Sequence, residues 1–165
     1  MTIVAHTHPF VIGVDTHARN HTLALLAANG EVIDTDQFPT TTSGMARAIS
    51  WAGRRTGGDL AVLWVIEGVA SYGAGLAAAL DRAGYEVVEA ARMNARNNRG
   101  VGKSDPLDAH RIAAAVLSLE TGQLRRPRLA QGVRAALRVL VVARDHMTAE
   151  RTATVNALIA LLRVV

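Results

Sequence analysis

The sequence predicts an α/β fold in which a five-stranded mixed β-sheet is flanked by helices and followed by one long helix. Two apolar runs, residues 10–15 and 60–68, have the composition of buried strands. Residues 21–38 contain two strand-like runs around Asn29-Gly30, a dipeptide that strongly indicates a β-hairpin. Segments with helical spacing alternate with the later strands, as they do in α/β domains.

The first part of the chain is expected to form three antiparallel strands and a helix. The first apolar run and the two strands of 21–38 would make a three-stranded meander. Residues 42–55 place apolar side chains at helical spacing, and Ser43 is suited to cap that helix. Trp51 and Trp64 lie in apolar patterns and are expected in the core.

The next part is expected to add two strands and two helices. The run 60–68 should be a buried central strand, followed by a helix over 71–84 and a strand over 85–90. A further helix should begin at Asp105 and continue to Leu119. The resulting order, β-β-β-α-β-α-β-α, is that of the RNase H-like fold.

Two carboxylates end buried strands in this scheme. Asp15 ends the first strand and Glu67 ends the fourth. Doubly wound sheets place their sites beyond the carboxyl ends of central strands, so the pair indicates a functional site. The alternative is that both are exposed charges of the kind that strand ends often carry.

The stretch GKSDPLDAHRIA places Asp105 and Asp108 three residues apart at a helix start. Capping explains them locally, because Asp105 suits the N-cap, the proline after it suits the first helical position, and Asp108 suits a capping box. A metal site is the alternative, because residues three apart share one helix face. With Asp15 and Glu67 they would offer the hard oxygen ligands that magnesium or manganese prefers.

Two histidines follow Asp15 in the sequence. His17 and His21 lie where a turn is expected to enter the second strand. Histidine is a common metal ligand, but at a turn of this kind we interpret both as ordinary surface residues.

The basic residues indicate contacts with nucleic acid. The formal net charge is +4 and the pI about 10.6, carried almost entirely by arginine. Arginine binds phosphate through planar, bidentate contacts, although its abundance also fits the codon bias of a GC-rich genome. Two clusters are expected to bind phosphates, and a plain solvated loop is the alternative for the first. The clusters consist of Arg92, Arg96, Arg99 and Lys103, and of Arg125, Arg126 and Arg128.

The C-terminal residues 133–165 contain no glycine or proline and place apolar residues near helical spacing. A lone helix of this length cannot bury its apolar stripe, so we expect a homodimer or a higher oligomer through it. The predicted organisation is a catalytic domain over 1–121, a basic linker over 122–132 and this helix. The helical pattern reaches Val165 without a C-cap, so the chain is expected to be cut short.

The composition predicts a cytoplasmic protein. Cysteine is absent, so there is no disulfide framework and no thiolate metal site. No apolar run reaches the roughly 18 residues that a membrane span needs, and the N-terminus lacks the pattern of a signal peptide. A soluble cytoplasmic protein without a membrane partner is expected.

Three stretches resemble the N-terminal region of the DEDD transposases of IS-one-ten-type insertion sequences, a family that includes the Piv-like DNA invertases. They are VIGVDTHARNHTLALLAANGEV, WVIEGVASYGAGLAAAL and NARNNRGVGKSDPLDAHRIA. The signature D…E…K[ST]D-x-x-D-A is matched at Asp15, at Glu67 and over 103–109. The tail VARDHMTAERTATVNALIALL is similar to the helical segment that follows in the family.

This resemblance implies the RuvC-like (RNase H-like) domain of a transposase or recombinase that cleaves and transfers DNA strands. It implies that Asp15, Glu67, Asp105 and Asp108 are catalytic and bind magnesium or manganese. DNA is the implied partner, and a structured guide RNA is a further one. Family members continue into a domain with a catalytic serine, so we expect this chain to be inactive in complete transposition.

Two other functions remain open. An actin-like or sugar-kinase ATPase half-domain also begins with an aspartate at a strand end, but Asp15-Thr16-His17 lacks the glycine of its phosphate turn. That function also gives Asp105 and Asp108 no role. A non-catalytic nucleic-acid-binding or dimerisation module would leave the carboxylates structural, and a titration with divalent metal distinguishes it from a transposase domain.

Overall fold

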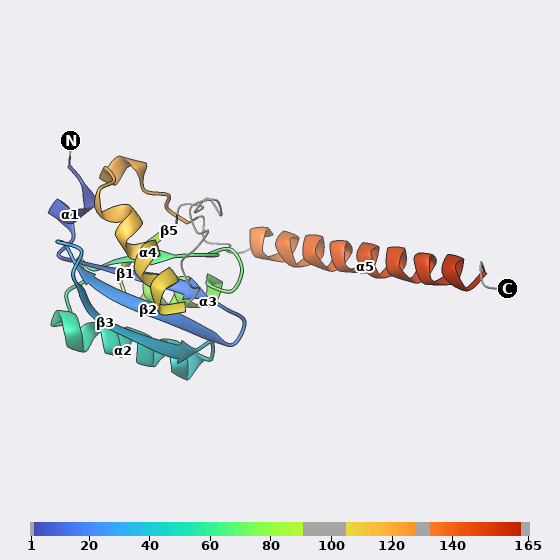
Figure 1. Cartoon of the computed structure of the whole chain (residues 1–165), viewed down its shortest axis with the longest axis horizontal. Helices are drawn as coiled ribbons and strands as arrows, with labels where there is room; N and C mark the ends of the chain where they lie inside the picture. The colour runs from blue at the N-terminus through green and yellow to red at the C-terminus, as the bar shows by residue number, and fades with distance from the viewer. Residues whose placement is uncertain (1, 91–104, 128–132, 163–165) are drawn as a thin grey trace. The chain divides into compact units, whose positions relative to one another are not determined.

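The computed structural model describes residues 2–90, 105–127 and 133–162 (Figure 1). The chain divides into two compact units, Met1–Leu129 and Ala130–Val165. The first unit holds a β-sheet with its helices, and the second holds the helix α5 (Val133–Leu162). Within the described ranges, no helix combines the length and the apolar character that a membrane span requires.

The sheet of the first unit has five strands in the order β3-β2-β1-β4-β5. The strands β1, β2 and β3 are antiparallel neighbours, whereas β4 is parallel to both β1 and β5. The prediction of a five-stranded mixed sheet is therefore confirmed, including the parallel pairing of the two apolar runs. The strands are β1 (Phe10–Thr16), β2 (Asn20–Ala27), β3 (Val32–Pro39), β4 (Leu63–Ile66) and β5 (Glu86–Glu89).

Helices cover both faces of this sheet, as Figure 1 shows. On one face, Ile12, Trp64 and Trp51 are buried together with side chains from α2 and α3. On the other face, Val11 and Leu26 are buried against α4. Both tryptophans lie in the core, as predicted. The helices of this unit are α1 (Val4–Thr7), α2 (Thr42–Thr56), α3 (Ala74–Arg82), α4 (Asp105–Leu117) and the 3-10 helix η2 (Thr121–Gln123).

The hairpin between β2 and β3 turns at Asn29-Gly30, as predicted. Gly30 has φ of 86°, a left-handed conformation that favours glycine, and the Asn29 side chain accepts a hydrogen bond from the backbone N–H of Glu31 at 3.0 Å. The N–H of Ala27 donates to the carbonyl of Glu31 at 2.9 Å and closes the loop. A register irregularity between Leu25 and Leu26 accommodates the turn.

Several element boundaries differ from the predicted ones because local hydrogen bonds decide them. Thr41, not Ser43, caps α2, since its hydroxyl accepts from the backbone N–H of Gly44 at 3.1 Å. Strand β4 begins at Leu63 rather than at residue 60, because the Asp59 carboxylate accepts from the Ala61 N–H at 2.8 Å and holds a turn there.

Candidate metal centre

Asp15 lies near the carboxyl end of β1, on the face that α4 covers. Its residue is 7% exposed, and it pairs in register with Thr22 of β2, which is also buried. The Thr22 hydroxyl accepts a hydrogen bond from the side-chain amide of Gln37 at 3.2 Å. Asp15 thus lies beside polar side chains at the end of a central strand.

Glu67 is positioned directly after β4, beside the end of β1. Its backbone N–H donates to the carbonyl of Val14 at 3.1 Å, which extends the parallel pairing by one residue. Its own carbonyl accepts from the hydroxyl of Thr16 at 2.8 Å. Gly68 then turns the chain with φ of 62°, a conformation that favours glycine. These contacts fix the Glu67 backbone next to Asp15.

The first turn of α4 supplies Asp105 and Asp108. The helix lies on the sheet through small residues, since Gly13 of β1 leaves no space for a side chain against the backbone of Ala109 and Ala113. The helix begins at Asp105, so this residue lies in its first turn. Oδ1 of Asp105 is 3.8 Å from Nε2 of His17.

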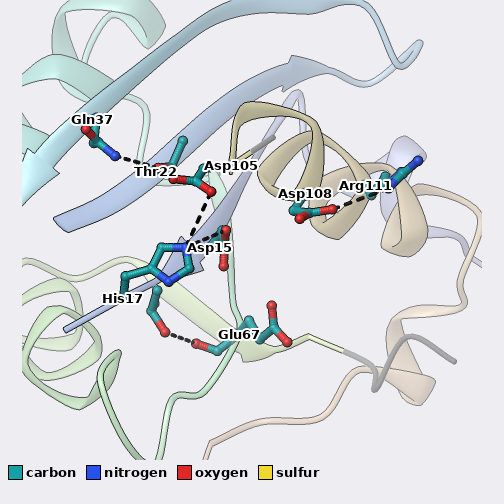
Figure 2. A network of polar contacts seen from close by, with 9 residues as sticks. Asp15, His17, Thr22, Gln37, Glu67, Asp105, Asp108 and Arg111 are labelled. Atoms are coloured by element: carbon teal, nitrogen blue, oxygen red, sulfur yellow. Dashed lines mark hydrogen bonds and ion pairs between the residues drawn. The ribbon is translucent and has the colours of Figure 1, made fainter. Parts of the chain in front are cut away.

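Figure 2 shows how these side chains lie, with Asp15 between Glu67 and the first turn of α4. Nε2 of His17 is 3.0 Å from Oδ2 of Asp15. One ligand atom each from Asp15, His17 and Asp105 lies within 4.8 Å of the other two. Asp108 lies outside this group of three, and its Oδ1 accepts a hydrogen bond from Arg111 at 3.3 Å.

The charges of the four carboxylates act on one another. Burial raises the pKa of Asp15, His17 lowers it in part, and the carboxylates of Asp105 and Asp108 raise it further. Burial likewise raises the pKa of Glu67, with added contributions from Asp15 and Asp108 and an opposing one from His17. Ionisation of Asp15 and Glu67 is thus less favourable in the folded protein than in water, and a nearby cation would offset this cost.

The donor set fits a divalent metal ion. Four carboxylates offer hard oxygen ligands and one imidazole offers a nitrogen, and a bound cation would offset both the burial and the mutual repulsion of the acids. The carboxylates of Asp15 and Asp105 lie close enough together to share such an ion, and the charges of Asp15 and Asp108 reach Glu67.

The interpretation of the two histidines as surface residues is wrong for His21, whereas the side chain of His17 is exposed at the surface. His17 is half exposed but faces the acids, which the spacing Asp15-x-His17 could have indicated, because alternate strand residues share a face. His21 is buried at 2% exposure, with Nδ1 unpartnered within the part of the chain that the structure describes. Burial, with a smaller effect of His17, lowers the pKa of His21 and so favours its neutral imidazole.

The predicted phosphate-binding residues are described in part. Arg125 and Arg126 follow η2 in the first unit. The carbonyl of Arg125 accepts a hydrogen bond from the backbone N–H of Glu89 at 2.7 Å. The side chain of Arg126 is 78% exposed and forms an ion pair with Glu86 at 3.1 Å. Part of the predicted linker thus pairs with β5. The remaining predicted residues, Arg92, Arg96, Arg99, Lys103 and Arg128, lie outside the described residues.

Solved structures with a similar fold include two of RuvC from Thermus thermophilus. RuvC in complex with a Holliday junction substrate matches with a TM-score of 0.53 at 14% sequence identity, over 73% of this chain and 100% of that chain. A second RuvC structure matches with a TM-score of 0.52 at 12% identity, over 72% and 99% of the two chains. At these identities the likeness establishes the fold, which is the predicted RNase H-like, RuvC-like one.

No curated protein matches the sequence. The family model of the DEDD transposases of the IS110 (IS-one-ten) type, described as "Transposase", matches residues 12–165, which is nearly the whole chain. The chain therefore belongs to this family of DEDD transposases.

Proposed function

We propose that this chain is the catalytic domain of a DNA transposase that uses magnesium or manganese to cleave and transfer DNA strands. Membership of the transposase family supports the activity. The observation that carries the metal dependence is the meeting of Asp15, Glu67, Asp105 and Asp108 at one end of the sheet, with burial raising the pKa of the first two. The proposed domain covers residues 1–121, and 122–132 join it to the helix.

The residues of the site have distinct parts in this proposal. Asp15 and Glu67 sit on rigid backbone at the ends of β1 and β4 and fix the position of the site, and α4 brings the other two carboxylates to it. Divalent ions held there would stabilise the attacking and leaving oxygens as one phosphorus–oxygen bond forms and another breaks. The Arg111 side chain keeps Asp108 oriented beside them.

A cleavage assay with a matched pair of variants tests this function. In manganese or magnesium, the chain should nick supercoiled DNA, and Glu67→Gln should lower the rate at least about 100-fold because it removes a charged ligand. Glu31→Gln, at an exposed turn, should leave the rate unchanged.

A second measurement applies if the chain alone does not complete catalysis. With ferrous iron, ascorbate and peroxide, hydroxyl radicals formed at the bound ion should cut the adjacent DNA, and Glu67→Gln should abolish that cutting. If neither metal-dependent nicking nor localised radical cutting occurs, the non-catalytic module becomes the better description.

The basic residues should make DNA binding dependent on salt. If about 4–6 phosphates are neutralised, the logarithm of the affinity should fall with the logarithm of the salt concentration with a slope of about −4 to −5. Replacing both Arg125 and Arg126 by glutamine should reduce that slope by about 2, and fluorescence anisotropy measures it. Arg47 and Arg54, exposed on α2, provide the control pair.

The same experiment separates DNA contacts from a general effect of charge. A slope unchanged by the Arg125 and Arg126 substitutions, or reduced equally by the control pair, would contradict their assignment. Contacts with phosphates carry no sequence information, so a structured guide RNA would be bound by the same residues and compete with DNA.

The helix α5 is proposed to form a homodimer. Its large apolar side chains are exposed, and five of them, 55–68% exposed, share one heptad seam. A helix in a protein gains most of its stability from packing of its apolar face, so a second copy of this helix is the expected cover. The apolar residues of the seam are Leu137, Leu140, Met147, Leu158 and Leu161, and its remaining positions hold Arg144, Arg151 and Thr154.

Light scattering across a concentration series tests the dimer. The particle in solution should have twice the mass of one chain. Leu140→Lys should raise the dissociation constant of the dimer by at least about tenfold, because it places a charge in the seam. Val142→Lys, two residues along and away from the seam, should not. A monomer at all concentrations would refute this assembly.

A further inference from the structure

His17 is held in place by the tight turn that joins β1 to β2. Its backbone N–H donates to the carbonyl of Asn20 at 3.0 Å. Thr40 then fixes the turn from outside: its N–H donates to the carbonyl of Arg19 at 3.0 Å, and its hydroxyl donates to the carbonyl of Ala18 at 3.1 Å. The imidazole therefore projects from a braced backbone, as a preorganised ligand does.

The distances around Nε2 of His17 suit a shared metal ion. Two atoms that both bind one ion at about 2.1 Å are at most about 4.2 Å apart. Nε2 is 3.0 Å from Oδ2 of Asp15 and 3.8 Å from Oδ1 of Asp105, so each pair is within that limit. The three groups come from β1, from the turn after it and from α4, so they converge from three different parts of the chain.

A simple ion pair explains the arrangement less well. An ion pair of an exposed side chain contributes little to stability, and the His17 side chain is 52% exposed with room to point into water. It faces two carboxylates instead. Histidine supplies no negative charge to a metal site, but its nitrogen changes which metal the site prefers.

We propose that Nε2 of His17 is a metal ligand, and that with Asp15 and Asp105 it makes one position of the site prefer manganese to magnesium. Imidazole nitrogen binds transition metals well, whereas magnesium takes oxygen ligands and gives up its water reluctantly. Glu67 and Asp108 lie outside this group of three and offer oxygen alone, so the site has a mixed nitrogen–oxygen side and an oxygen side. This inference rests on the proposed divalent-metal site.

Electron spin echo spectroscopy of Mn²⁺ bound to the full chain tests the ligand directly. The wild type should show modulation from a directly bound ¹⁴N nucleus, and His17→Ala and His17→Asn should both lose it. His146→Ala, which removes an exposed imidazole from α5, should keep it. Urea unfolding of each variant verifies that the fold is intact.

Affinities measured by calorimetry complete the test. The ratio of Mn²⁺ affinity to Mg²⁺ affinity should fall about tenfold in His17→Asn, as expected for loss of one ligand. Unchanged ¹⁴N modulation or an unchanged ratio in the His17 variants would overturn the role of His17. If Asp15→Asn meanwhile abolishes Mn²⁺ binding, the metal site itself stands; if the wild type binds neither ion at millimolar concentration, both proposals fail.

Discussion

Replacing Gly13 by alanine is expected to lower the free energy of unfolding by about 3 kcal/mol or more. A Cβ atom at this position would lie 2.1 Å from the carbonyl oxygen of Ala109 and 2.6 Å from the backbone nitrogen of Ala113. Both are backbone atoms in the middle of α4, so no side chain can move aside to make room. The helix as a whole must shift away from β1.

Urea unfolding followed by the fluorescence of the two buried tryptophans measures this loss. Gly53→Ala is the matched control, since nothing lies within 4 Å of a Cβ there and the residue is inside α2. It should stabilise the protein by about 0.5–1 kcal/mol through helix propensity. Because α4 carries Asp105 and Asp108, Gly13→Ala should also weaken metal binding. A wild-type unfolding midpoint would mean that α4 does not pack on β1 as described.

The arrangement of the sheet could be predicted because it depends on long-range burial. Strands β1 and β4 are buried on both faces, and such strands need near-continuous apolar runs that are visible in the sequence. Two parallel strands require a crossover connection, and the connection from β1 to β4 includes the helix α2. Once β1 and β4 are neighbours, Asp15 and Glu67 must meet at the same end of the sheet.

Features that depend on single hydrogen bonds could not be predicted in the same way. Thr41 and Ser43 are both good capping residues, and the direction of the chain after β3 decides between them. His17 faces the acids because the turn from β1 to β2 is short and because Thr40, distant in sequence, hydrogen-bonds the backbone of that turn. The pairing of Arg111 with Asp108 likewise depends on how α4 is rotated on the sheet.

The contribution of Asp15 and Glu67 to the stability of the metal-free protein should fall as the pH rises through the acid range. Burial raises the pKa of Asp15 and Glu67 in the folded state above their ordinary values of 3.8 and 4.5. Between these ordinary values and the raised ones, the folded protein binds more protons than the unfolded chain, so the free energy of unfolding decreases with pH. At pH above both raised pKa values, both carboxylates are ionised and the free energy of unfolding decreases no further from this cause.

Magnesium or manganese should therefore stabilise the fold more at pH 8 than at pH 5. A cation offsets the charge that ionisation creates, and at 100 times the dissociation constant the expected gain is about 2.7 kcal/mol. Asp15→Asn should abolish this gain at pH 8 while leaving the metal-free protein as stable as the wild type or more so, because one buried negative charge is removed. Thermal unfolding of the wild type and of Asp15→Asn, at both pH values and with and without metal, measures these changes in stability.

Asp81→Asn, at an exposed position on α3, is the control and should leave the metal effect intact. The opposite result for Asp15→Asn would be a loss of metal-free stability with an unchanged gain from metal. The negative charge of Asp15 would then stabilise the fold through its contact with His17, whose ring nitrogen lies 3.0 Å away, and would not serve a metal ion. Because the asparagine carbonyl can still accept from His17, the substitution removes the charge of Asp15 while preserving its capacity to accept this hydrogen bond.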